Sequence, residues 1–194
     1  FSGGWGGGTA RPLWLVARGA ETGLVGVAIS SSAPAVAARC SFARAGVGAV
    51  ASQNVTDPSL GPLALDLMEQ GMTAAAAVAK VRQIGRFIEY RQVLAVDSIG
   101  GTAIHSGPNS LGIWTQAEGK DVASGGNLPA NDGVCQAVVD GVQAAEGHPG
   151  DPPTAALPPR LAAGRGARPV LSAARKRAQQ RCPPAGARRR PPAQ

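Results

Sequence analysis

The stretch RPLWLVARGAETGLVGVAIS, residues 11–30, decides the fold because it has the pattern of a β-hairpin. Apolar residues alternate with their neighbours on both sides of a central turn, and they are Leu13, Leu15, Val25, Val27 and Ile29. A period of two is typical of half-buried strands. The glycines of segment 19–23 supply the backbone angles that a tight reversal needs. We therefore predict two antiparallel strands, at about 12–18 and 23–31.

The rest of the sequence up to residue 150 predicts further strands in hairpins and helices in pairs. The expected elements are a buried strand at 45–53, helices at 63–71 and 74–83, a second hairpin at 90–107, a strand at 122–127 and a helix at 131–147. Thr73 is a suitable N-cap for the second of these helices. Paired strands with paired helices indicate an α+β fold with antiparallel sheets, because a parallel sheet would need strands and helices to alternate.

Charge and proline are distributed unevenly and divide the chain of 194 residues, whose net charge is +7. Residues 151–194 contain ten Lys and Arg, one acidic residue, nine of the 16 prolines and no aromatic residue. Such a segment buries too little apolar surface to offset its chain entropy. We predict a glycine-rich flexible leader at 1–11, a folded domain at 12–150 and a basic, disordered tail at 151–194.

Cysteines and apolar runs exclude several classes of protein. Cys40, Cys135 and Cys182 are widely and irregularly spaced, which favours free thiols in a reducing compartment over a disulfide or a metal site. No apolar run reaches the roughly 20 residues that span a bilayer. The start lacks the basic and apolar regions of a signal peptide. The sequence thus predicts a cytoplasmic protein with no metal and no membrane partner.

Two motifs suggest nucleotides or nucleic acids, but their context is wrong. Gly46-x-Gly48-x-x-Ala51 matches a dinucleotide fingerprint by its letters, yet no helix is expected to open at its end. We therefore expect no nucleotide and no other cofactor. The arginine runs of the tail lack interleaved aromatic residues, so we expect no specific binding of nucleic acid.

Polar residues at the ends of the expected strands are candidates for a binding site. They are Gln53, Asn54, Arg91 and Asn127, and each lies beside glycine or turn residues, where loops converge. We expect all four at one end of the sheets. His105, next to Ser106, is a weak candidate for a catalytic base.

Several stretches together resemble a known bacterial family. They are VARGAETGLVGVAIS, ARAGVGAVASQNVTDPSLGPLALDLMEQG, EYRQVLAVD, HSG and GGN, which follow one another in order over residues 12–145. The resemblance is to the domain of unknown function 1028 (DUF1028), a family placed in the N-terminal nucleophile (Ntn) hydrolase superfamily. It implies a four-layer αββα sandwich of two antiparallel sheets. We expect the sandwich to be incomplete, because the tail lacks the pattern of the family's last helix and strand.

The superfamily's chemistry, as the resemblance implies it, is amide hydrolysis by the side chain and α-amine of a first Thr, Ser or Cys. In this chain Pro12 stands where the Thr would be, so the nucleophile is missing. Thr9 lies three residues too early and is only a weak candidate. Ser110 stands where members of the family often have Cys. Together with the composition of the tail, these departures suggest a degraded or frameshifted gene copy.

Two hypotheses about function remain open. The first is an uncharacterised protein of amide-hydrolase ancestry that is inactive as written. The second is a noncatalytic module that binds a small molecule or peptide and keeps the family's pocket near the polar candidates. Either implies a small amide or peptide ligand, and the sequence leaves homo-oligomerisation open.

Overall fold

The computed structural model describes residues 12–31, 35–127, 132–144 and 169–170. Its first element pair is the predicted hairpin. Strand β1 (Leu13–Arg18) pairs in antiparallel register with β2 (Val25–Ser30), with Leu13 opposite Ser30 and Arg18 opposite Val25. The period-two pattern of residues 11–30 is therefore confirmed as an antiparallel pair.

The described strands form two sheets in which every pairing is antiparallel. Sheet A has the order β7-β8-β1-β2-β9, and its other members are β7 (Trp114–Gly119), β8 (Val122–Asn127) and β9 (Pro169–Val170). Sheet B has the order β3-β4-β5-β6, with β3 (Ser41–Arg44), β4 (Gly48–Gln53), β5 (Gln92–Asp97) and β6 (Thr102–Ser106). The expected α+β class with antiparallel sheets is thus confirmed.

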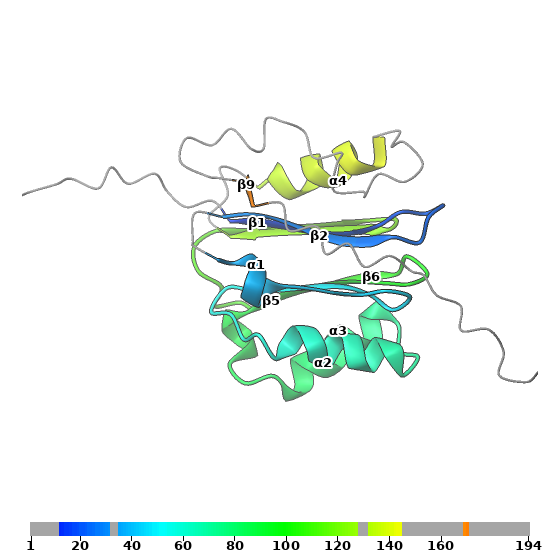
Figure 1. Cartoon of the computed structure of the whole chain (residues 1–194). Coiled ribbons are helices and arrows are strands. Elements are labelled where there is room, and N and C mark those ends of the chain that lie inside the picture. Colours follow the sequence, from blue (N-terminus) through cyan, green and yellow to red (C-terminus); the bar gives the residue numbers. More distant parts are fainter. Residues whose placement is uncertain (1–11, 32–34, 128–131, 145–168, 171–194) are drawn as a thin grey trace, which may run out of the picture.

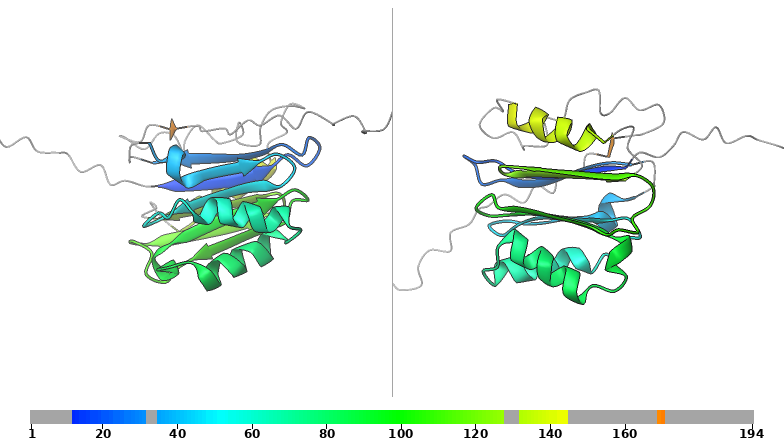
Figure 2. Two further views of the ribbon diagram at one scale, coloured as in Figure 1. Left: turned by 60° about the horizontal axis from the view of Figure 1, so that its bottom comes forward. Right: turned by 180° about the vertical axis from the view of Figure 1, so that it is seen from behind.

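Helices cover the outer face of each sheet. Helices α2 (Leu60–Glu69) and α3 (Ala74–Ile84) pack on sheet B, and α4 (Val134–Ala144) packs on sheet A (Figures 1 and 2). Thr73 caps α3 as predicted, because its side chain accepts a hydrogen bond from the N–H of Ala76. Two short helices, α1 (Ala37–Cys40) and the 3-10 helix η1 (Ile88–Tyr90), lead into β3 and β5.

The two sheets pack face to face, and alternation along each strand divides the core into three layers. Trp14, Val16, Ala51 and Leu94 lie between the sheets. The alternate residues of sheet A pack against α4, and those of sheet B pack against α2 and α3. The inner strands are therefore apolar on both faces. Among the described residues, no helix has the length and apolar character needed to cross a membrane.

The structure differs from the sequence-based expectation at four strands. Strand β3 was not expected, because all four of its residues are only partly buried and show no alternation. Strand β4 begins at Gly48 rather than at residue 45, because residues 45–47 form the turn after β3. Strand β7 was not expected, because only part of it, Thr115 and Ala117, alternates into the core. Strand β9 pairs with the edge of β2 inside the segment that was expected not to pack.

Candidate functional site

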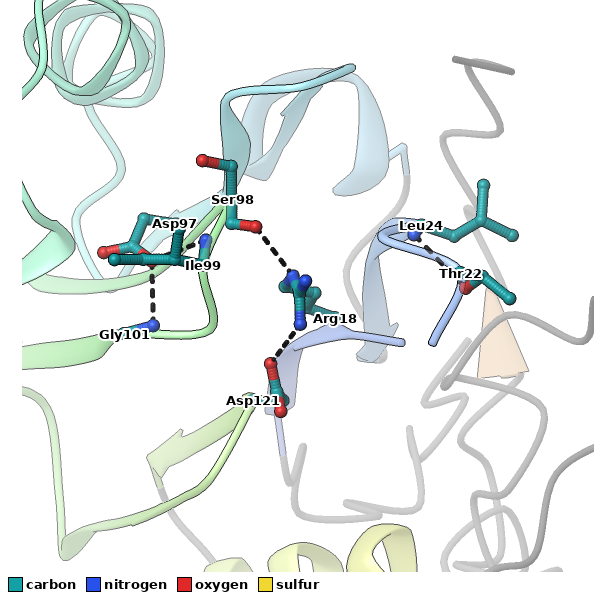
Figure 3. Close-up of polar contacts among 8 residues, drawn as sticks. All are labelled: Arg18, Thr22, Leu24, Asp97, Ser98, Ile99, Gly101 and Asp121. Atoms are coloured by element: carbon teal, nitrogen blue, oxygen red, sulfur yellow. Dashed lines mark hydrogen bonds and ion pairs between the residues drawn. The ribbon is translucent and has the colours of Figure 1, made fainter. Parts of the chain in front are cut away.

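The strand registers give the sandwich two distinct ends. At the turn end, Arg18 joins the sheets: its Nε donates to the carbonyl of Ser98 at 2.8 Å and its Nη1 pairs with Asp121 at 2.8 Å (Figure 3). The other end is where β4, β6 and β8 finish and β1 and β5 begin, and we call it the polar end. Because the turn ends of the two sheets meet, their polar ends also face each other.

Three of the predicted binding residues finish or precede strands at the polar end. Gln53 is the last residue of β4, Arg91 precedes β5 and Asn127 is the last residue of β8. Asn54 follows Gln53 directly. The expectation that the four share one end of the sheets is met, and their role in binding stays a prediction.

A relay of buried amides crosses sheet B at this end. Gln53 Nε2 donates to Gln92 Oε1 at 2.7 Å, and Gln92 Nε2 donates to the hydroxyl of Ser106 at 2.9 Å. Alternation along β4 and β5 turns both glutamines toward sheet A, since Ala51 and Leu94 face it as well. Gln53 Oε1 is buried and has no hydrogen-bond partner. The relay therefore holds Gln53 in place and leaves one acceptor unused.

The two residues after β4 have unusual backbone angles. Asn54 and Val55 have φ values of 58° and 49°, in the left-handed region, where a β-branched residue such as valine is rare. Asn54 Oδ1 accepts a hydrogen bond from the N–H of Leu111 at 3.3 Å, which fixes the orientation of the amide. The Nδ2 of Asn54 is buried and has no partner.

Arg91 is engaged by the loops beside the site rather than left free for a ligand. The guanidinium donates to the carbonyls of Arg86 and Val55 and lies 4.0 Å from a carboxylate oxygen of Asp57. It is 7% exposed. Arg91 thus holds the strained segment after β4 against the segment before β5. These contacts position the two segments, and direct binding of a ligand by Arg91 stays a prediction.

The pKa of Asp57 is lowered, chiefly because the hydroxyl of Ser59 donates to its carboxylate, and also through the N–H of Ser59 and the charge of Arg91. Asp57 therefore contributes stability that is present above the unfolded-state pKa of about 3.9 and is lost as the pH falls through the folded-state value.

We expect Asp57→Asn to lose stability less steeply than the wild type when the pH is lowered below about 4. Urea unfolding at several pH values measures this, and parallel profiles would contradict it.

His105 lies on the wrong face of β6 to join the polar candidates. Ser106 and Ile104 face sheet A, whereas His105 faces the helix side, where its Nε2 is 3.0 Å from the carbonyl of Ile88. Because a carbonyl can only accept, Nε2 carries the proton in this contact and holds the ring on the helix side. The structure therefore does not bring His105 together with Gln53 and Asn127.

Sheet A contributes two residues to the polar end. Asn127 donates its backbone N–H to the carbonyl of Pro12, just before β1. Its Oδ1 is buried without a partner. Trp14 packs between the sheets, and its indole Nε1 is also buried without a partner. Trp14 was not among the binding residues predicted from the sequence, because a tryptophan in an alternating strand is usually a core residue.

Unpartnered buried polar atoms are concentrated at this end. Among the described side chains there are five: Trp14 Nε1, Gln53 Oε1, Asn54 Nδ2, Ser110 Oγ and Asn127 Oδ1. All five residues are at least nine-tenths buried. Each belongs to the polar end or to the loop that bonds Asn54. Because an unpaired buried polar group costs free energy, such a concentration in one place points to a ligand site.

Exposed apolar side chains lie next to these atoms. We call Val55, Leu111 and Trp114 the apolar rim, and their exposed fractions range from 38% to 57%. Val55 follows Asn54, Leu111 follows Ser110 and Trp114 pairs with Asn127 in the register of β7 and β8. Clustered exposed apolar residues around buried polar groups are typical of small-molecule sites.

A family model described as "Family of unknown function (DUF1028)" matches residues 14–181. The chain belongs to this family. A crystal structure of a Silicibacter pomeroyi protein that is also described as DUF1028 matches with a TM-score of 0.72 and 22% identity. The match covers 80% of this chain and 68% of that protein, and at this identity it shows a shared fold. A search of curated proteins found no match.

The DUF1028 match continues past the domain boundary that the sequence suggested at residue 150. It ends at residue 181 and so includes β9, which pairs with β2 through Val170 opposite Ile29. The family pattern therefore extends into the segment interpreted as a frameshifted tail. The weak candidate Thr9 lies outside the described residues.

Two buried thiols lie near the polar end. The Sγ of Cys40, just before β3, is 3.5 Å from the hydroxyl of Thr56 in the loop after β4. Cys40 and Cys135 are buried free thiols, and burial raises the pKa of Cys135. The Sγ of Cys135 donates to the carbonyl of Thr115 in the layer beneath α4. Within the described part of the chain, no group of three His, Cys, Asp or Glu could hold a metal ion.

Proposed function

We propose that this DUF1028 protein has the architecture of an Ntn hydrolase and binds a small ligand at the polar end without cleaving amide bonds. The layering of helix, sheet, sheet and helix supports the architecture. The observation that carries the binding function is the set of five unpartnered buried polar atoms at one end of the two sheets. A ligand that pairs with them would recover the free energy that their isolation costs.

The start of β1 supports the lack of hydrolysis. Pro12 precedes β1, and its carbonyl accepts the backbone N–H of Asn127. Proline offers neither a hydroxyl nor a thiol as a nucleophile. Within the described part of the chain, the hydroxyls of Ser106 and Ser110 have no imidazole beside them on this face, because His105 faces the helices. Binding without bond cleavage is therefore the function that these groups support best.

We expect the 194-residue chain to show no amide turnover above buffer on a broad panel of acyl amides. Loss of an activated nucleophile typically removes several orders of magnitude in rate. Product formation followed by mass spectrometry measures this. Turnover that Thr9→Ala abolishes would contradict the proposal and assign catalysis to Thr9, whereas turnover lost only in His105→Ala would assign it to the helix side of β6.

Binding at the polar end is tested by amide NMR spectra of the full chain with a mixed set of charged and uncharged fragments. We expect shifted resonances to cluster at residues of the polar end, such as Gln53, Asn54 and Asn127. The turn end around Arg18 and Asp121 serves as the internal control, because its polar groups are paired. Shifts that occur only at the turn end, or nowhere, would overturn the proposal.

A further inference from the structure

We propose that the ligand of the polar end is uncharged and presents a carbonyl with N–H groups on an adjacent nitrogen, as a ureido or primary carboxamide group does, attached to an apolar substituent. This inference rests on the proposed binding function and specifies its ligand. It follows from three features of the site: the kinds of unpartnered atoms, the pairing of the nearby charges and the position of the apolar rim.

The unpartnered atoms include both donors and acceptors. Trp14 Nε1 can only donate, and Asn54 Nδ2 donates because the Oδ1 of the same amide already accepts from Leu111. Gln53 Oε1 and Asn127 Oδ1 accept, and the hydroxyl of Ser110 can do either. A carbonyl oxygen has two lone pairs for the two donors. Its neighbouring N–H groups can serve the two acceptors.

The two charged groups beside the polar end, Arg91 and Asp57, already have protein partners. Arg91 donates to two backbone carbonyls and lies near Asp57, whose carboxylate accepts from Ser59. A carboxylate or ammonium ligand would therefore enter a buried environment that offers it no free opposite charge. Burying an unpaired charge is far more costly than burying a neutral amide. The site thus favours a neutral ligand over a charged one of the same shape.

The apolar rim indicates which substituent the polar head group of the ligand carries. Val55, Leu111 and Trp114 are direct chain or register neighbours of Asn54, Ser110 and Asn127. A polar group that bonds the buried atoms would bring an attached substituent against these side chains. Covering them removes apolar surface from water. An aromatic or branched aliphatic substituent therefore increases the affinity.

Four probes of nearly equal shape test the head group on the full chain. Benzylurea and hydrocinnamamide carry neutral heads, hydrocinnamate carries an anionic head and benzylguanidine carries a cationic head. We expect titration by NMR to give affinities for benzylurea and hydrocinnamamide at least about tenfold above those for both charged probes. Comparing the affinities of benzylurea and hydrocinnamamide shows whether the site prefers a ureido or a carboxamide head group. Tighter binding of either charged probe at the polar end would overturn this inference and leave the proposed binding function standing.

Two variants test the buried atoms. Trp14→Phe removes the indole N–H and Ser110→Ala removes the hydroxyl, and each should weaken benzylurea binding about tenfold. Ser110→Ala should also leave stability unchanged or raise it, because it deletes a polar atom that lacks a partner. The matched control is Thr115→Val, whose hydroxyl donates to the carbonyl of Asp132 beneath α4. We expect Thr115→Val to be less stable than the wild type and to bind benzylurea with unchanged affinity.

The rim is tested by Leu111→Ser, which keeps the backbone N–H that bonds Asn54. We expect this variant to weaken benzylurea several-fold and to leave the weak binding of unsubstituted urea unchanged. Ile99→Ser, at the turn end and 80% exposed, is the control and should change neither affinity. Equal effects of the two substitutions, or unaltered binding in both Trp14→Phe and Ser110→Ala, would overturn the inference. If none of the four probes binds at the polar end, this inference fails, whereas the proposed binding function fails only if no member of the mixed fragment set shifts the polar-end resonances.

Discussion

Replacing Asp97 by alanine is expected to lower the free energy of unfolding by about 4 kcal/mol. The loss of the buried carboxylate would leave several backbone N–H donors without a partner. Asp97 is the last residue of β5 and is 4% exposed. One of its carboxylate oxygens accepts the N–H groups of Ile99 and Gly101 (Figure 3). The other accepts the N–H of Ala74 at the start of α3. The side chain therefore joins the β5–β6 turn to a helix.

Urea unfolding of the full chain measures this effect. Asp97→Asn is the informative second variant, since it keeps one oxygen and should lie between alanine and wild type. The control is Asp66→Ala, because the side chain of Asp66 is 54% exposed and pairs only at the surface with Arg44. Surface pairs contribute roughly 0 to 1 kcal/mol. Equal losses in Asp97→Ala and Asp66→Ala would contradict the prediction.

Gly107→Ala is expected to cost about 2 to 3 kcal/mol, because there is no room for a Cβ atom after β6. A Cβ on Gly107 would lie 2.2 Å from the carbonyl oxygen of Glu89 and 2.6 Å from that of Ile88. The contact is with backbone, which cannot rotate away as a side chain would. The N–H of Gly107 also donates to the carbonyl of Arg91 at 2.8 Å. The substitution should therefore separate the loop after β6 from η1.

A second glycine separates this steric effect from backbone strain. Gly71 has a φ of 96° and nothing within 4 Å of its Cβ position, so Gly71→Ala carries only the conformational cost of about 1 kcal/mol. Both variants are compared by urea unfolding, and NMR of the Ser110 and Leu111 amides reports on the loop. The prediction would be wrong if Gly107→Ala lowered the free energy of unfolding less than Gly71→Ala and left the amide resonances of the loop unshifted. The backbone around Gly107 would then move easily to admit the Cβ atom.

Much of the fold could be predicted from local patterns. The alternation in residues 11–30 predicted β1 and β2, and Thr73 predicted the start of α3. Such features depend on residues within a few positions of one another, so the sequence displays them directly. Strand β7 was missed because only one of its faces is buried, and that face holds a threonine among its few residues. Strand β9 was missed because its segment has the composition of a disordered chain.

The candidate site could be predicted only in part. The positions of Gln53, Asn54 and Asn127 beside glycines and turns placed them at strand ends, and the register puts these ends together. His105 has the same kind of position, yet it points to the helices, because the residue that faces sheet A is fixed by the register of β5 and β6. Position along the chain therefore does not specify toward which face of the sheet a side chain points.

The sequence by itself determined the class of the fold, the main hairpin, the helix cap and the identity of the residues at strand ends, because these follow from short-range periodicity and backbone preference. Only the tertiary structure decided which polar atoms are left without partners. Gln53 bonds a residue 39 positions away and Asn54 bonds one 57 positions away, so each amide's free atom depends on how distant strands and loops meet. Hydrogen-bond satisfaction is a property of three-dimensional neighbours, and sequence distance carries no information about it.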